Sequence, residues 1–179
     1  MNLRLEEVSV SFIEVPFKKG FSLSQNRKLV NLRERWVQLK LSETGSMARG
    51  AGNIFDSTQW AHPLHLHPHA QTETDLDFFE KGSIHLEESL KGSSFAGLFA
   101  ADQALTERAL AYANDFQRER NYALTPIMPM MLAAPFSVAL FSAYEQLSGH
   151  PFFGGLQEAP LRTAFEAFIR YKTGFEAKQ

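Results

Sequence analysis

The chain has 179 residues, of which 44% are hydrophobic and 21% charged, and its formal net charge is -2. This length suits one domain, or one domain with a helical extension, and is enough to bury a core. The small net charge gives no general attraction to nucleic acid or to an anionic membrane, so neither is expected as a partner. Zero cysteines exclude disulfides, and the first residues lack the apolar core of a signal peptide, so a cytoplasmic location is expected.

The first strand is predicted from a period-two pattern. Val8, Val10 and Phe12 alternate with serines, which is typical of a strand with one buried face. This strand is predicted to end at Pro16. The segment 17–28 is polar, contains a glycine and has no regular period, so we predict a loop there.

A hairpin and a second loop are predicted next. Residues 35–41 alternate again, the turn residues at 43–46 follow, and 47–54 form the returning strand. The segment 55–74 contains two prolines, four of the six histidines and no clear period. Long loops of this kind are more often functional or mobile than structural.

Four helices are predicted after this loop. The first starts at a capping box at Thr74, the second covers 105–116, and the third covers 135–147 and ends at Gly149. The third is apolar nearly all round, which indicates a central buried helix, and its proline-interrupted neighbourhood is too short for a membrane span. A fourth is predicted from Pro160 to Gly174. The residues expected to face the core from the first two helices are Leu76, Phe79, Leu86, Leu90, Leu105, Ala109, Tyr112 and Phe116.

Strands followed by helices indicate an α+β fold. We expect a three-stranded antiparallel meander sheet followed by about four helices that pack on it. No G-x-S-x-G or G-x-x-x-x-G-K-(S/T) motif is present, which disfavours a serine hydrolase of that type and a P-loop nucleotide enzyme.

Two sequence blocks carry a family resemblance. The first block comprises Val-Pro-Phe-Lys-Lys-Gly-Phe at 15–21, Arg-Trp-Val-Gln-Leu-Lys-Leu at 35–41 and Ala-Arg-Gly-Ala-Gly at 48–52. The second block runs from 133 to 149 and continues with His-Pro-Phe-Phe-Gly-Gly at 150–155. In order and spacing these blocks resemble the N-terminal capping domain of the enolase superfamily, in its mandelate racemase and muconate lactonizing enzyme group. The resemblance departs from the family pattern in the third strand, where the Trp and Glu of G-W-G-E are absent.

The resemblance implies a capping domain over residues 1–155 and a C-terminal helical extension over 156–179. In the family this domain covers a (β/α)₈ barrel, which supplies the bases and the acidic magnesium ligands of racemases, cycloisomerases and dehydratases. Such a barrel needs at least about 200 residues, whereas only 24 residues follow Gly155. We therefore expect no cofactor in this chain, magnesium only in a parent enzyme, and no catalysis by the chain alone.

Two loops of the family cap close over the barrel and select the substrate. By position they correspond to 18–28 and 53–74. The residues expected to contact a small organic acid are Lys18, Lys19, Phe21, Leu23, Arg27 and Ile54. The alternative, that the lysines are solvated loop charges, is favoured where no barrel lies beneath them.

The histidine-rich loop is a candidate metal site. His65, His67 and His69 would share one side of an extended segment, and imidazoles so placed can bind zinc, nickel or copper. Their spacing matches no established zinc pattern, so adventitious binding is the alternative.

Three functions remain open from the sequence. The chain is a substrate-lid domain that works with a separate barrel, a stand-alone non-catalytic α+β protein that forms a homodimer or binds a small ligand, or a metal-binding module built on the histidine loop.

Overall fold

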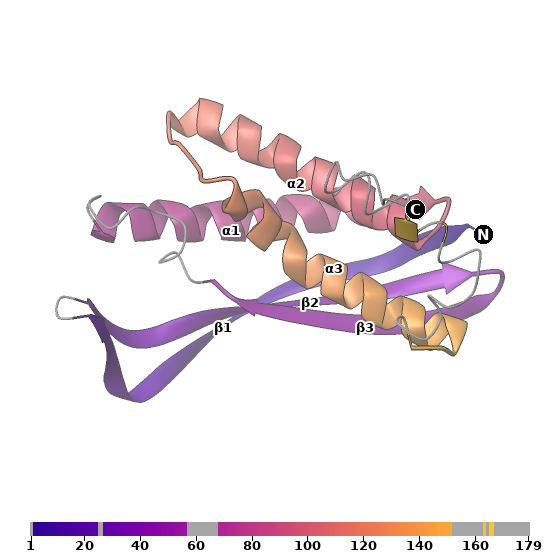
Figure 1. Ribbon diagram of the computed structural model, residues 1–179, viewed down its shortest axis with the longest axis horizontal. Helices are drawn as coiled ribbons and strands as arrows, with labels where there is room; N and C mark the ends of the chain where they lie inside the picture. Colours follow the sequence, from indigo (N-terminus) through magenta and orange to yellow (C-terminus); the bar gives the residue numbers. More distant parts are fainter. Residues whose placement is uncertain (1, 25–26, 57–67, 152–162, 164, 167–179) are drawn as a thin grey trace.

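The computed structural model describes residues 2–24, 27–56, 68–151, 163, 165 and 166, and for residues 17, 21–24, 27–31 and 68–72 it describes the backbone alone. The elements in chain order are β1 (Leu3–Ser24), β2 (Arg27–Glu43), β3 (Ser46–Phe55), α1 (Pro68–Leu90), β4 (Ser94–Phe95), α2 (Leu98–Arg120) and α3 (Ile127–Ser148). The described part of the chain therefore forms an α+β fold, in which three helices lie on one side of a curled sheet (Figure 1).

The sheet is antiparallel and has the strand order β3-β2-β1-β4. The first three strands are consecutive neighbours, which confirms the predicted meander. The predicted strand count was wrong, because β4 pairs with the start of β1 through Leu3 and Arg4. Two residues cannot show a period, so the sequence pattern had no means of predicting β4.

The prediction of a loop at 17–28 was also wrong, because most of this segment continues the β1–β2 ladder. Pro16 pairs with Asn31, the register then shifts, and pairing resumes where Phe21 faces Leu29. A proline is tolerated on an edge strand, where its missing N–H removes no ladder bond. Since β4 pairs only with the first residues of β1, Pro16 lies on such an edge.

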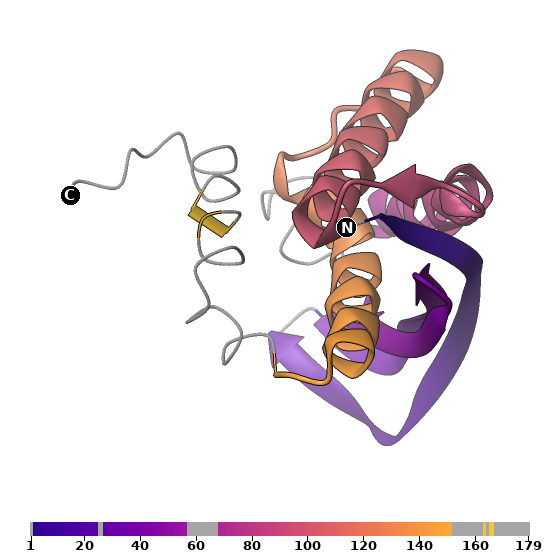
Figure 2. The same ribbon diagram turned by 90° about the vertical axis from the view of Figure 1, so that its right-hand side faces the viewer.

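Helix α3 lies directly against β3 through two glycines. A Cβ atom on Gly50 would lie 2.0 Å from the carbonyl oxygen of Ala139, and one on Gly52 would lie 2.1 Å from that of Pro135. No side chain fits in these spaces, so the two glycines allow the helix and strand backbones to touch. Figure 2 shows the sheet curling around α3 as a result.

Helix α3 is longer than predicted. It begins at Ile127 rather than at Pro135, and it ends as expected at Gly149, whose φ of 73° is left-handed. Pro135 lies inside the helix, where proline normally breaks the hydrogen-bond ladder. The helix is long and apolar enough to cross a membrane by length and composition, but its buried side chains face the sheet and α2, as in a core helix of a globular domain.

Helix α1 begins at Pro68, so the predicted start at Thr74 was wrong and residues 68–74 are helical rather than loop. Proline is favoured in the first turn of a helix, which explains the earlier start. Gly82 does not interrupt the helix. A Cβ atom there would lie 2.8 Å from the side chains of Leu132 and Tyr112. The glycine makes room for the contact between the three helices.

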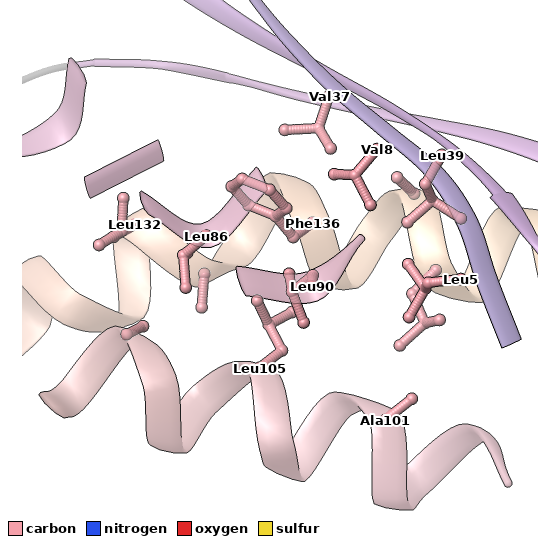
Figure 3. Packing of buried hydrophobic residues seen from close by; sticks show 14 of the residues in the cluster. Leu5, Val8, Val37, Leu39, Leu86, Leu90, Ala101, Leu105, Leu132 and Phe136 are labelled. Carbon is pink, nitrogen blue, oxygen red and sulfur yellow. The ribbon is translucent and has the colours of Figure 1, made fainter. Parts of the chain in front are cut away.

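The core lies between the sheet and the helices. Figure 3 shows side chains from the strands, such as Val8 and Leu39, directed toward side chains of the helices, such as Phe136. Of the residues expected to face the core from α1 and α2, Leu76 and Tyr112 are half-buried and the others are buried. The predicted helical periods are thus confirmed.

The predicted fourth helix lies largely outside the described residues. Within it, residues 163, 165 and 166 are helical, and the ring of Phe165 lies 6.0 Å from that of Phe99. This contact joins the C-terminal segment to the first turn of α2.

Candidate functional site

The lid residues expected from the sequence lie on a projecting hairpin that we call the arm, residues 16–24 of β1 and 27–31 of β2. Figure 1 shows the arm curving away from the helices at the lower left. Lys18 and Lys19 are exposed on it. Because a hairpin braces its own backbone, the arm places these two charges well away from the core.

The other expected contacts are distributed differently. Phe21, Leu23 and Arg27 have their backbones in the arm, but their side chains lie outside the described residues. Ile54 is half-buried on β3 and pairs with Arg35, several residues along the sheet from the arm. The structure therefore does not bring Ile54 together with Lys18 and Lys19.

The candidate metal ligands are not described. His65 and His67 lie outside the described residues, and His69 is described only as backbone in the first turn of α1. Within the parts of the chain that the structure describes, no group of three or more His, Cys, Asp or Glu side chains could hold a metal ion. Metal binding by the histidine loop stays a prediction.

A buried arginine centre, which the sequence reasoning missed, lies at the end of β3. Arg35 of β2 is fully buried beneath the helices, and its guanidinium donates hydrogen bonds to Ser83 Oγ of α1 at 2.8 Å and to the carbonyl oxygen of Met131 at 2.8 Å. It also lies 4.9 Å from the ring centroid of Phe79. One side chain from the sheet thereby holds both α1 and α3.

Pro135 explains why α3 needs its contact with Arg35. Proline has no N–H, so the carbonyl oxygen four residues earlier, that of Met131, loses its normal helical donor. Arg35 donates to this oxygen from the sheet. A buried carbonyl without a donor is costly, so the guanidinium replaces the missing bond and permits a proline inside a continuous helix.

Asp56 is the charged partner of Arg35. It follows β3 directly, its backbone N–H donates to the carbonyl oxygen of Arg33 at 2.9 Å, and its Oδ1 lies 3.2 Å from Arg35 Nη2. Both side chains of the ion pair are fully buried. The pair therefore fixes the point at which the chain leaves the sheet for the segment that precedes α1.

Burial dominates the electrostatics of this pair. Loss of solvation raises the pKa of Asp56 from its ordinary 3.8 to about 6, although the positive charge of Arg35 pulls it down. The same loss of solvation lowers the pKa of Arg35 to about 10, against the opposing effect of Asp56. At neutral pH the centre is thus an ion pair whose desolvation is only partly offset.

The arginine centre is suited to positioning rather than to chemistry. The two terminal nitrogens of Arg35 are occupied by Ser83, Met131 and Asp56, and its Nε has no partner but is fully buried, so the guanidinium offers no accessible pair of donors to a substrate carboxylate. A signal for Arg35 was present in the sequence, because it continues the inward alternation of Val37 and Leu39. It was missed because a charged residue at an inward position is normally read as a strand end.

The protonation of Asp56 gives a testable pH dependence. Because the pKa of folded Asp56 exceeds the ordinary value, its contribution to stability is fully present below about pH 4 and is lost as the pH rises through about 6. We expect the free energy of unfolding of the wild type, measured relative to that of Asp56→Asn, to fall by about 2 kcal/mol between pH 4 and pH 7. Urea unfolding of both proteins across this range measures it, and a difference that grows with pH would contradict the assignment.

Comparisons with known proteins were made at the level of sequence and of structure. No protein-family model and no curated protein matches the chain. A member of the enolase superfamily from Roseovarius nubinhibens, complexed with magnesium, is similar in structure, with 16% identity and a TM-score of 0.42 over 82% of this chain and 31% of that chain. A putative mandelate racemase/muconate lactonizing enzyme from the same organism has 10% identity and a TM-score of 0.42 over 81% and 31%. The chain thus spans under a third of the length of these structures.

Proposed function

We propose that this chain is the substrate lid of an enzyme similar to the enolase-superfamily isomerases and lyases, and that the catalytic barrel is supplied outside these 179 residues. The observation that carries the proposal is the arm, a two-stranded projection that bears the exposed Lys18 and Lys19. It includes residues 16–19 of the Val-Pro-Phe-Lys-Lys segment, which is part of the sequence resemblance.

The arm suits recognition of a carboxylate. A lysine ammonium is a compact point charge on a flexible stem, so it attracts an anionic group without requiring one fixed geometry. A lid of this kind excludes water from the reacting centre and commits the bound substrate. We propose that Lys18 and Lys19 contact a small organic acid when the arm lies over a barrel.

The remainder of the fold supports the lid mechanically. The Arg35–Asp56 pair anchors the end of β3 to α1 and α3, which keeps the sheet fixed against the helices while the arm extends from it. Proton abstraction next to a carboxylate and the stabilisation of the resulting enediolate by magnesium are assigned in this proposal to the barrel. In the same proposal, the described residues of the chain bind and orient the substrate acid.

Substitution of the two lysines tests the proposal. In the native assembly of lid and barrel, Lys18→Ala combined with Lys19→Ala is expected to raise KM for carboxylic acids about tenfold while kcat changes less, because a binding contact is lost. The readout is exchange of the α-hydrogen in D₂O containing Mg²⁺, followed by NMR over a panel of carboxylic acids.

Lys91→Ala is the matched control, since Lys91 is an exposed lysine in the turn before β4, at the opposite end of β1 from the arm. The proposal fails if the double substitution leaves KM at the control value. It fails equally if the 179-residue chain by itself catalyses the exchange.

A further inference from the structure

One edge of the sheet is uncovered along most of its length. On the outer side of β1, Leu5 bonds to residues 92 and 93, and β4 pairs only with Leu3 and Arg4. Beyond Leu5, no strand in the described part of the chain pairs with this side of β1. The outer side of such a strand presents N–H and C=O groups that can recruit an extended segment of another chain. We call the stretch 8–12 of β1 the open edge.

The register identifies the backbone groups on the open edge. The N–H of Asp56 donates to the carbonyl oxygen of Arg33, so the backbone groups of odd-numbered β2 residues point to β3 and those of even-numbered residues point to β1. The even-numbered β2 residues pair with the odd-numbered residues 9–13 of β1. The backbone groups of Val8, Val10 and Phe12 therefore point outward, away from β2.

A side chain of α1 occupies the centre of the open edge. Glu87 Oε2 accepts a hydrogen bond from the backbone N–H of Val10 at 3.0 Å. A neighbouring strand would need the same N–H, so it cannot pair in register while the carboxylate is in place. Glu87 is held there because Leu86 and Leu90, on either side of it in α1, are buried in the core.

The sequence of this strand explains why its edge needs a guard. Residues 8–15 read Val-Ser-Val-Ser-Phe-Ile-Glu-Val, with five β-branched or aromatic residues, one charge and neither proline nor glycine. Segments of this composition form intermolecular β-structure readily when an edge is available. Charged residues and a proline flank the segment, with Glu6 and Glu7 before it and Pro16 and Lys18 after it, an arrangement typical of protected hydrophobic strands.

The edge at β3 is protected in a different way. Gly50 and Gly52 lie within this strand, and glycine lowers the tendency of a segment to pair as a strand. The outward-facing residues of β3 include Arg49, whose side chain is highly exposed, and a charge on an edge disfavours the addition of another chain. The β1 edge has neither feature between residues 8 and 12, which leaves Glu87 as its protection.

We propose that Glu87 holds the open edge closed, and that the partner it excludes is the segment 8–15 of a second copy that has not yet folded. An unfolded copy presents this segment without its own α1, so the segment could pair along Val8, Val10 and Phe12. This inference is independent of the lid function, because neither Lys18 and Lys19 nor the arginine centre takes part in it.

Hydrogen exchange tests the contact itself. Glu87→Met keeps the length of the side chain and removes the acceptor, so the Val10 amide should exchange at least about tenfold faster than in the wild type. Glu87→Gln keeps an acceptor oxygen and should exchange at nearly the wild-type rate. Glu88→Met is the matched control, since Glu88 is an exposed neighbour on α1. Circular dichroism checks that each variant is folded.

Refolding tests the excluded partner. When urea-unfolded protein is diluted to micromolar concentration, Glu87→Met should give at least about three times the light scattering of Glu88→Met. Adding Ile13→Lys to Glu87→Met should return the scattering to the control value, because a charge then lies in the pairing segment, while the Val10 amide still exchanges fast. A Val10 amide that exchanges equally in Glu87→Met and Glu88→Met overturns the proposal. Equal scattering of these two variants, or scattering unchanged by Ile13→Lys, overturns it as well.

Discussion

Arg35→Met is expected to destabilise the protein by about 3–5 kcal/mol, the usual result of removing one partner of a buried ion pair. The substitution leaves the carboxylate of Asp56 buried without its cation and the carbonyl oxygen of Met131 without a donor. It also removes the hydrogen bond to Ser83. Equilibrium unfolding in urea measures the loss.

Two comparisons separate the ion pair from a general effect of charge removal. Arg118→Met removes an exposed arginine whose partner, Asp115, is also exposed, so the expected loss is at most about 1 kcal/mol. Arg35→Met combined with Asp56→Leu should recover part of the stability, because no buried charge remains. A loss for Arg35→Met no larger than that for Arg118→Met would show that the arginine centre does not hold the helices to the sheet.

Gly52→Ala is the second substitution with a large expected effect. Its Cβ would lie 2.1 Å from the carbonyl oxygen of Pro135 and 2.8 Å from the backbone nitrogen of Ala139, so α3 must move away from β3. Overpacking against backbone atoms that cannot rotate away should cost about 3 kcal/mol or more, at the upper end for such changes. Thermal and urea unfolding give the difference.

The neighbouring residue provides the control for Gly52. Ala51 is exposed and points away from the helices, so Ala51→Ser changes the same strand without touching α3 and should stay within about 0.5 kcal/mol of the wild type. A Gly52→Ala variant as stable as Ala51→Ser would mean that the helix and strand backbones are not in contact.

The sequence predicted those strands and helices whose hydrophobic residues recur at a regular spacing. Val8 and Val10 of the alternating segment and Leu105 and Ala109 of the helical pattern face the core as expected. The arm was missed because its ladder is irregular near Pro16. The extension of α3 before Pro135 was missed because the residue that stabilises it, Arg35, lies about 100 positions earlier in the sequence, at a separation that no local pattern reports.

In the candidate site, too, local sequence patterns were predictable and contacts between distant residues were not. Lys18 and Lys19 were named as candidate contacts from a local motif, and they lie on the arm, as strand rather than loop; their role stays a prediction. The pairing of Arg35 with Asp56 and Ser83 depends on how three elements meet in space. Such contacts become visible only when the register of β2 and the packing of α1 are known.

The mass of the protein purified from its own cells, in its native assembly, tests the lid proposal most directly. The proposal predicts that this chain occurs together with a barrel of at least about 200 residues, either on one polypeptide or in a fixed ratio with a second one that carries acidic residues at its strand ends. A native assembly made only of this chain, at 20.2 kDa or at twice that mass, would contradict the lid function.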